Sequence, residues 1–87
     1  MKPLREGEQK ILMHMLEKNK PTVLSALVSE VGGSPNALVK NINRLVILGL
    51  LKEKREEKFP FRRHLELTEK GRKVAQLLKQ IYDTIGL

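Results

Sequence analysis

The densest group of charged side chains in this sequence is a run of six cations within residues 52–63. Ammonium and guanidinium groups spaced this closely can hold the phosphates of a polyanion, and an arginine among them can enter a minor groove. Glu53, Glu56 and Glu57 offset part of this charge. The alternative is an ordinary charged edge that keeps a strand from pairing with other chains. The candidate contacts are Lys54, Arg55, Lys58, Arg62 and Arg63.

A second group of polar side chains lies in residues 34–44, at spacings that place them on one face of a helix. With Leu38, Ile42 and Leu45 inward, asparagine, lysine and valine side chains face outward. Asparagine can pair with adenine, lysine with guanine and valine with a thymine methyl, while an arginine on the flank suits a phosphate. The alternative is a solvated helix face. The candidate residues are Ser34, Pro35, Asn36, Val39, Lys40, Asn43 and Arg44.

The residue patterns that covalent or metal chemistry needs do not occur. The sequence has no cysteine, and His14 and His64 are fifty positions apart with no paired carboxylate at ligand spacing. No serine stands in a nucleophile motif, and there is no phosphate-binding glycine loop. We therefore expect no enzyme activity, no metal and no cofactor.

The net charge points to a polyanionic partner. Seventeen Lys and Arg residues against ten Asp and Glu residues give +7. The excess lies in residues 40–79, where twelve cations and five acids differ by +7. Only 3% of the residues are aromatic, too few for the stacking platforms that bind single-stranded nucleic acid. Duplex nucleic acid, an acidic membrane and an acidic protein remain as partners.

A chain of 87 residues has the size of one small domain, and no linker or repeat divides it, so one domain is expected over residues 1–87. Its first residues turn polar where a signal peptide needs an apolar stretch. Its longest apolar run, residues 45–51, is far too short to cross a bilayer. We expect a cytoplasmic protein without a membrane partner.

Apolar periodicity predicts the helices that position these side chains. Helices are expected at residues 6–18 and 23–31. Pro21 separates them, because the residue before a proline is pushed out of the helical conformation, and Thr22 can cap the second helix.

A third helix is expected at residues 35–48, with Ser34 as its N-cap and Gly49 as its C-cap. About three residues separate it from the preceding helix, so the two must cross steeply, which makes a helix-turn-helix.

After Gly49 the apolar spacing changes from helical to alternating. Residues 50–67 predict a β-hairpin with a loose, charged tip that contains Pro60, and Thr68 can cap a final helix at residues 69–84. The predicted fold class is α+β, mainly α, with a three-helix core, a two-stranded hairpin and a C-terminal helix.

The final helix carries more apolar residues than one small core can cover. Four aliphatic residues recur at spacings of 4, 3 and 4, as in a short coiled-coil seam, and a tyrosine lies beside them. The alternative is that this helix packs only on its own domain, through Val74, Leu77 and Leu78. We expect a homodimer with an interface formed by Val74, Leu78, Ile81, Tyr82 and Ile85.

This order of elements, with the run Leu65-Glu66-Leu67-Thr68-Glu69-Lys70-Gly71 after a basic hairpin, resembles the winged helix-turn-helix transcriptional regulators, most closely small archaeal or bacterial members of the MarR type. The resemblance covers about residues 8–87. Residues 27–32 match the family's second-helix ending, residues 34–45 its recognition helix, and residues 48–51 and 67–71 the frame of its wing.

Two features depart from the family pattern. MarR subunits resemble this chain only in their core and add helices at both ends for dimerisation and effector binding, so a small-molecule effector stays unknown here. Val39, Val46 and Ile47 stand where the family usually carries polar residues on the recognition helix.

The resemblance implies a homodimer that binds double-stranded DNA sequence-specifically and regulates transcription. The alternative is a winged-helix protein-interaction module inside a larger assembly, with Val39, Val46 and Ile47 as its docking surface. A membrane binder acting through the final helix is a third interpretation, which the lack of a dense basic face on that helix disfavours.

Overall fold

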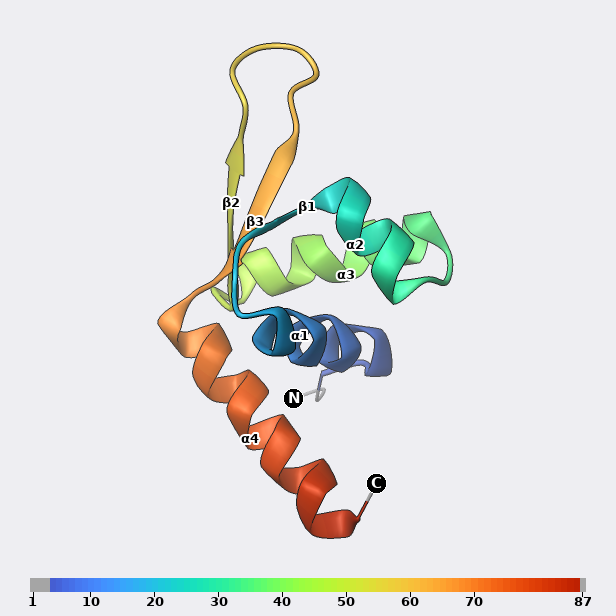
Figure 1. Ribbon diagram of the computed structural model, residues 1–87, viewed down its shortest axis with the longest axis vertical. Helices are drawn as coiled ribbons and strands as arrows, with labels where there is room; N and C mark the ends of the chain where they lie inside the picture. Colours follow the sequence, from blue (N-terminus) through green and yellow to red (C-terminus); the bar gives the residue numbers. More distant parts are fainter. Residues whose placement is uncertain (1–3, 87) are drawn as a thin grey trace.

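The computed structural model describes residues 4–86 (Figure 1). Residues 1–3 and residue 87, which the predicted domain includes, lie outside the described residues. The elements, in chain order, are α1 (Glu6–Lys18), β1 (Thr22–Val23), α2 (Leu24–Val31), α3 (Pro35–Ile47), β2 (Leu51–Arg55), β3 (Arg63–Leu67) and α4 (Glu69–Ile85). The predicted fold class, mainly α with a β-hairpin wing and a C-terminal helix, is confirmed.

The three strands form one antiparallel sheet in the order β1-β3-β2. β2 and β3 make the predicted hairpin, in which Leu51 pairs with Leu67 and Arg55 with Arg63. We call β2, β3 and the residues between them the wing, and residues 56–62 the wing tip. Because successive residues alternate between the two faces of a strand, Glu53 and Arg63 share the face of Leu51, on the core side.

The prediction that Thr22 caps the second helix is wrong. Thr22 is buried in β1, where it pairs with Leu65, and α2 begins at Leu24 instead of residue 23. The N-cap residue is Val23, whose side chain makes no capping hydrogen bond. A β-branched residue fits the extended conformation of a strand, and here the pairing with β3 outweighs the local capping tendency of threonine.

α3 begins at its predicted cap and ends one residue early. Ser34 Oγ accepts a hydrogen bond from the backbone N–H of Ala37 at 3.4 Å. Leu48, not Gly49, is the C-cap residue. Gly49 follows it with φ = +77°, a conformation that glycine adopts without steric cost, and so turns the chain into β2.

The core contains aliphatic side chains and one methionine but no aromatic ring. Every helix and both long strands contribute, and the three inward residues predicted for α3 are all buried. Its members are Ile11, Leu12, Met15, Leu27, Leu38, Ile42, Leu45, Leu50, Leu51, Leu65, Leu67 and Ala75. Such a core places α3 and the wing on one frame by interlocking side chains.

The start of α4 is locked against the turn between α3 and β2. Thr68 Oγ1 accepts from the N–H of Gly71 at 2.9 Å, which is the predicted cap, and donates to the carbonyl of Gly49 at 2.6 Å. Gly71 lies so close to β2 that an added Cβ would stand 1.8 Å from the carbonyl oxygen of Leu50. α4 can make this approach only because residue 71 has no side chain.

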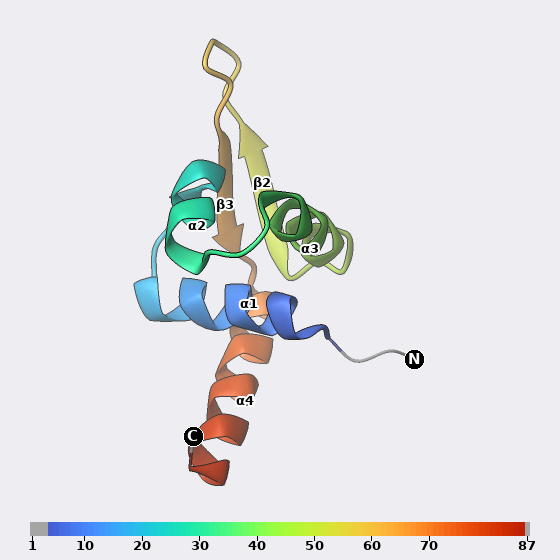
Figure 2. The ribbon, with the colours of Figure 1, turned by 90° about the vertical axis from the view of Figure 1, so that its right-hand side faces the viewer.

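The wing and the C-terminal half of α4 lie at opposite ends of an elongated molecule of 44 × 27 × 26 Å (Figures 1 and 2). α1 lies between them and packs against both α3 and α4. A partner bound at the C-terminal half of α4 would therefore not contact the wing.

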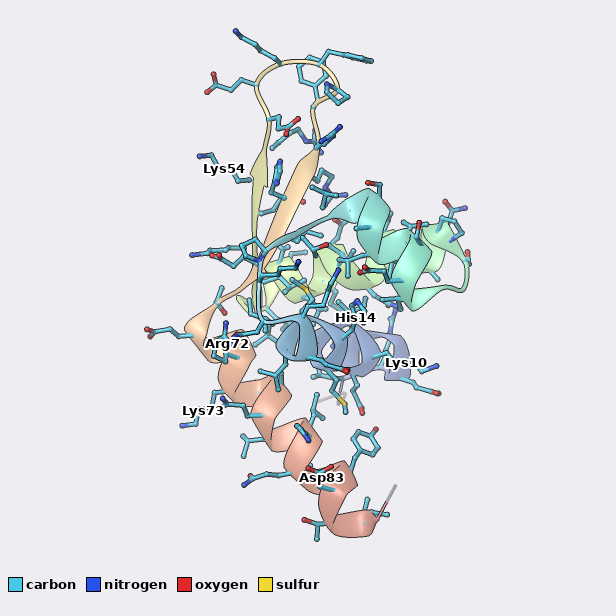
Figure 3. All side chains as sticks on the ribbon, in the orientation of Figure 1. Lys10, His14, Lys54, Arg72, Lys73 and Asp83 are labelled. Carbon is cyan, nitrogen blue, oxygen red and sulfur yellow. The ribbon has the colours of Figure 1, made fainter. Side chains whose placement is uncertain are left out.

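A surface cluster joins α1 to α2 and gives His14, labelled in Figure 3, a structural role. Glu30 accepts hydrogen bonds from Lys18 Nζ at 2.6 Å and from His14 Nε2 at 3.0 Å. The Lys18 ammonium, followed by the His14 imidazole, holds the pKa of Glu30 below its ordinary value. Glu30 therefore stays charged at neutral pH and keeps the two helices paired.

Candidate nucleic-acid interface

The outer face of α3 carries most of the side chains predicted to read bases. Five of the seven candidates in residues 34–44 are exposed, whereas Val39 and Arg44 are half-buried. The exposed residues are Ser34, Pro35, Asn36, Lys40 and Asn43. Ser34 Oγ caps the Ala37 N–H and Pro35 has no N–H, so the Asn36 N–H is the backbone donor that the first turn offers beside its side chains.

Asn43 is exposed but is held in place by the wing. Its side-chain oxygen accepts a hydrogen bond from Arg63 Nη2 at 2.9 Å, and Arg63 Nε donates to Glu53 at 2.6 Å. The Arg63 side chain is only 17% exposed. The structure therefore places Arg63 between the wing and α3, where it fixes their relative position, and not on the surface that would face a phosphate.

This contact also changes what Asn43 can recognise. A bidentate pair with adenine uses the amide oxygen as acceptor and the amide nitrogen as donor. Since Arg63 uses one of the two lone pairs of this oxygen, the amide N–H groups are the groups that Asn43 presents most freely, and these suit an acceptor such as a guanine or thymine oxygen, or a phosphate.

The remaining wing candidates are exposed cations. Lys54, Arg55, Lys58 and Arg62 are all exposed, and no ion pair within residues 4–86 involves any of them or Lys40. Figure 3 shows the Lys54 side chain pointing away from the wing. These cations are free to meet phosphates without first breaking a contact.

Three of the four acids of the wing are engaged by their neighbours, and Glu66 is the one that pairs with Lys52, at 2.8 Å. Glu53 binds Arg63, and Glu56 accepts from His64 Nε2 at 2.8 Å and from the backbone N–H of Arg62 at 3.3 Å. The hydrogen bond from His64 is the main cause that keeps the pKa of Glu56 below its ordinary value. These contacts turn the Glu53 and Glu56 carboxylates toward the hairpin and leave the cations on its outside.

Arg44 is part of the core frame. Its Nη1 donates to Glu8 Oε1 at 2.5 Å, and the Glu8 side chain is fully buried. Glu8 Oε1 also accepts from the backbone N–H of Arg5 at 2.7 Å, which caps α1. Arg44 therefore neutralises a buried charge and ties α1 to α3, and it is not placed as the phosphate contact that its position on the helix flank predicts.

The predicted dimer residues divide into two groups. Val74 and Leu78 are half-buried against the core, and the Tyr82 hydroxyl donates to Gln9 on α1 at 2.6 Å. Ile81 and Ile85 are exposed, together with Leu77, at spacings of four residues. The free apolar stripe on α4 is therefore Leu77, Ile81 and Ile85.

Within residues 4–86 no group of three His, Asp or Glu side chains could hold a metal ion, and no helix has both the length and the apolar character needed to cross a membrane. The two histidines pair with one glutamate each.

No protein-family model and no curated protein sequence matches the chain, but solved structures do. A mutant of ZitR from Lactococcus lactis in apo form has a TM-score of 0.79 at 23% identity, over 94% of this chain and 61% of that one. The adhesin competence repressor AdcR from Streptococcus pyogenes has a TM-score of 0.78 at 22% sequence identity, over 94% of this chain and 60% of that one. AF1382 from Archaeoglobus fulgidus has a TM-score of 0.82 at 21% identity, over 95% of this chain and 91% of that one.

The fold is a winged helix-turn-helix, as in these three structures. α2 and α3 form the helix-turn-helix, and the fold expected from the sequence resemblance is confirmed. The chain spans about three fifths of the length of the ZitR and AdcR chains and nearly all of AF1382.

One feature of the wing escaped the sequence reasoning. Phe59 and Phe61 at the wing tip are exposed, and their rings meet edge to face with centroids 6.3 Å apart. The signal was present in the sequence, because two phenylalanines flank a proline in a segment with no alternating apolar partners.

Proposed function

We propose that this chain binds double-stranded DNA sequence-specifically, as a homodimer, and regulates transcription. The observation that carries the proposal is a set of four exposed wing cations, Lys54, Arg55, Lys58 and Arg62, which have no ion-pair partner within residues 4–86 although acids stand beside them in the sequence. The other exposed wing cation, Lys52, pairs with Glu66. If these charges served solubility alone, there would be no reason for acids to be paired within the hairpin while the cations stay unpaired on its surface.

In this proposal, α3 enters the major groove and the wing follows the phosphate backbone. Asn36, Lys40 and Asn43 face base edges, with Val39 at the margin of the contact. The helix start at Ser34 and Pro35, with the Asn36 N–H as its backbone donor, faces a phosphate. Lys54, Arg55, Lys58 and Arg62 contact phosphates. Arg44 and Arg63 keep α1, α3 and the wing in position.

The similar structures support the proposal at a coarser level. One of them is named as a repressor, and all have the same arrangement of helix-turn-helix and wing. The proposal includes the cytoplasm as location, where a bacterial or archaeal cell keeps its DNA, one domain over residues 1–87, and no catalytic role.

Removing two wing-tip cations tests the phosphate contacts. In a titration of random-sequence duplex DNA, log K should fall with log salt by about 0.9 per phosphate contact. Lys58→Ala with Arg62→Ala should weaken binding to all sequences alike and reduce this slope by up to about 2. The matched control is Lys73→Ala with Lys79→Ala, which removes two exposed cations from α4 and should leave the slope unchanged. An absence of binding by the unmodified protein at low salt would contradict the proposal.

The exposed stripe on α4 tests the homodimer. Leu77, Ile81 and Ile85 leave an apolar surface at the end away from the wing, so two chains joined there keep both wings free. Light scattering should give a mass of about 20 kDa, twice the 10.0 kDa of one chain, and Ile81→Asp should return it to about 10 kDa. The control is Ile47→Asp, an equally apolar exposed residue on α3, which should remain dimeric. A monomeric unmodified protein would contradict the seam.

A protein-interaction module is the second candidate, and the 84% exposure of Ile47 is the observation that favours it. The docking surface expected from the sequence is smaller in the structure, because Val46 packs against the core and Val39 is half-buried. Ile47 with its neighbour Leu48 is too small a patch to form a specific interface alone. We therefore prefer DNA binding.

A further inference from the structure

We propose that the Phe59 ring is a wedge that enters the minor groove of duplex DNA and partly separates two stacked base pairs, so that the protein bends the DNA it binds. This inference rests on the proposed DNA binding and adds a mechanical activity to it. Apolar side chains inserted between base steps kink a duplex by about 20–90°.

The first observation is the exposure of two aromatic rings at the most protruding point of the molecule. Phe59 is 86% exposed and Phe61 51% exposed, and they are two of the three aromatic residues in the chain. The wing extends away from the helices (Figures 1 and 2), and only Phe61 borders the start of α2, where it lines a pocket with Leu24 and Ser25. Burial of the Phe59 ring requires another molecule.

The second observation is that the tip has a defined shape. The N–H of Phe61 donates to the carbonyl of Lys58 at 2.8 Å, and the N–H of Glu56 donates to the carbonyl of Arg62 at 2.9 Å. The Phe59 and Phe61 rings stand at 89° to each other. A ring held by a closed turn and by an edge-to-face neighbour loses little freedom on insertion, as a wedge requires.

The backbone conformation of Phe61 is a third observation that supports a defined shape of the wing tip. Its φ is +56°, in the left-handed region that bulky residues other than glycine seldom adopt. Such strain persists where the surrounding structure imposes it, and it is concentrated at functional sites. At this position it turns the Phe61 ring against the Phe59 ring, so that Phe59 is the exposed wedge and Phe61 supports it from the side.

The charges beside the rings select a nucleic acid as the partner. Lys58 and Arg62 flank the two phenylalanines, and both are exposed and without an ion pair among the described residues. Of the two acids at the wing tip, Glu56 is engaged by His64, and Glu57, next to Lys58, is exposed. A ring with a cation on each side suits a minor groove, which has stacked bases at its floor and phosphates along both walls.

An anionic membrane would attract the same cations, but it is the weaker fit. An amphipathic helix or a lipid anchor buries far more apolar surface in a bilayer than two rings can. The wing tip offers two rings, and the exposed polar face of α3 would have no partner on a membrane. Duplex DNA uses the wing tip and α3 together.

The bend can be measured on duplexes of about 30 base pairs that carry a fluorescence donor at one end and an acceptor at the other. A kink of this size shortens the distance between donor and acceptor and so raises the energy transfer. One duplex has TA steps at its centre, which unstack easily, and the other has a stiff A-tract of the same base composition. The unmodified protein should raise the energy transfer, and more so on the duplex with TA steps. Phe59→Ala should bind with the same salt slope and within about tenfold of the original affinity, but should leave the energy transfer at its value for free DNA.

Two further variants sharpen the test. Phe59→Leu keeps an apolar wedge and should retain part of the bend. Ile47→Ala removes a side chain of equal exposure on α3 and should bend DNA like the unmodified protein. All three changes are at exposed positions, so thermal unfolding should be unaffected.

The outcomes separate the wedge from the DNA binding on which it rests. If Phe59→Ala bends the duplex as strongly as the unmodified protein, the wedge is overturned and the DNA-binding proposal stands. If the unmodified protein binds neither duplex, both proposals fail. Phe59-dependent binding to phosphatidylserine vesicles without binding to duplex DNA would also overturn the wedge and assign the tip to a membrane.

Discussion

Replacing Arg44 with leucine is expected to lower the free energy of unfolding by about 3 kcal/mol. The Glu8 carboxylate is fully buried, and Arg44 is the cation that neutralises it. Glu8 Oε2 has no hydrogen-bond partner among the described residues, so the loss of Arg44 would leave the charge with the Arg5 N–H alone. We place the effect at the lower end of the range for buried pairs because the Arg44 side chain is 32% exposed and water can reach it.

A double replacement separates the ion pair from simple packing. Glu8→Leu with Arg44→Leu removes both charges, and it should be markedly more stable than Arg44→Leu alone, because no unpaired charge remains inside. Urea denaturation of the unmodified protein, the two single variants and the double variant gives the coupling energy. Equal stability of Arg44→Leu and the unmodified protein would show that Arg44 is free for another role, such as the phosphate contact expected from the sequence.

Replacing Gly71 with alanine is expected to cost about 3 kcal/mol, the upper part of the range for overpacked sites. Within an exposed helix the same change would stabilise the protein by about 1 kcal/mol, so the local environment reverses the sign. The new Cβ would overlap the carbonyl oxygen and carbon of Leu50, which are backbone atoms of the turn into β2 and cannot rotate away. α4 would have to move outward from the sheet.

Gly7→Ala is the matched control for this prediction. An added Cβ at Gly7 would meet the side-chain nitrogen of Asn41, at the end of a flexible side chain that can turn aside. Its effect on the free energy of unfolding should therefore stay within about 1 kcal/mol. Equal effects at Gly7 and Gly71 in thermal or urea unfolding would refute the tight contact between α4 and Leu50.

The local order of elements could be predicted because the signals are local. α1 has the predicted bounds, and Ser34 and Thr68 cap α3 and α4 as expected. β1 could not be predicted in this way, because two residues show no alternation. What makes Thr22 a strand residue is its pairing with Leu65, forty-three positions later, which no local pattern contains.

The roles of the charged residues were predictable only in part, for the same reason. The cations of the wing tip are exposed as their sequence context suggests, but Arg44 and Arg63 are bound by groups 36 and 20 positions away. A sequence pattern shows which side chains point outward from a helix or strand, but it does not show which of them meet a partner on another element. The same limit applies to α4, where no local pattern shows that the Tyr82 hydroxyl donates to Gln9 on α1.

The structure thus separates two sets of cations that have the same appearance in the sequence. Arg44 and Arg63 hold α1, α3 and the wing together, while Lys40, Lys54, Arg55, Lys58 and Arg62 face solvent. The first set should affect stability and DNA binding together when mutated, and the second set DNA binding alone.

We propose that α3 and the wing form one DNA-binding surface. The most direct test is to add duplex DNA to the isotope-labelled protein and to map the changes in amide chemical shift. The shifting or broadened signals should fall in residues 35–43 and 54–62, and the signals at the exposed end of α4, around Ile81 and Ile85, should stay unchanged. Shifts confined to α4, or no shifts at low salt, would contradict it.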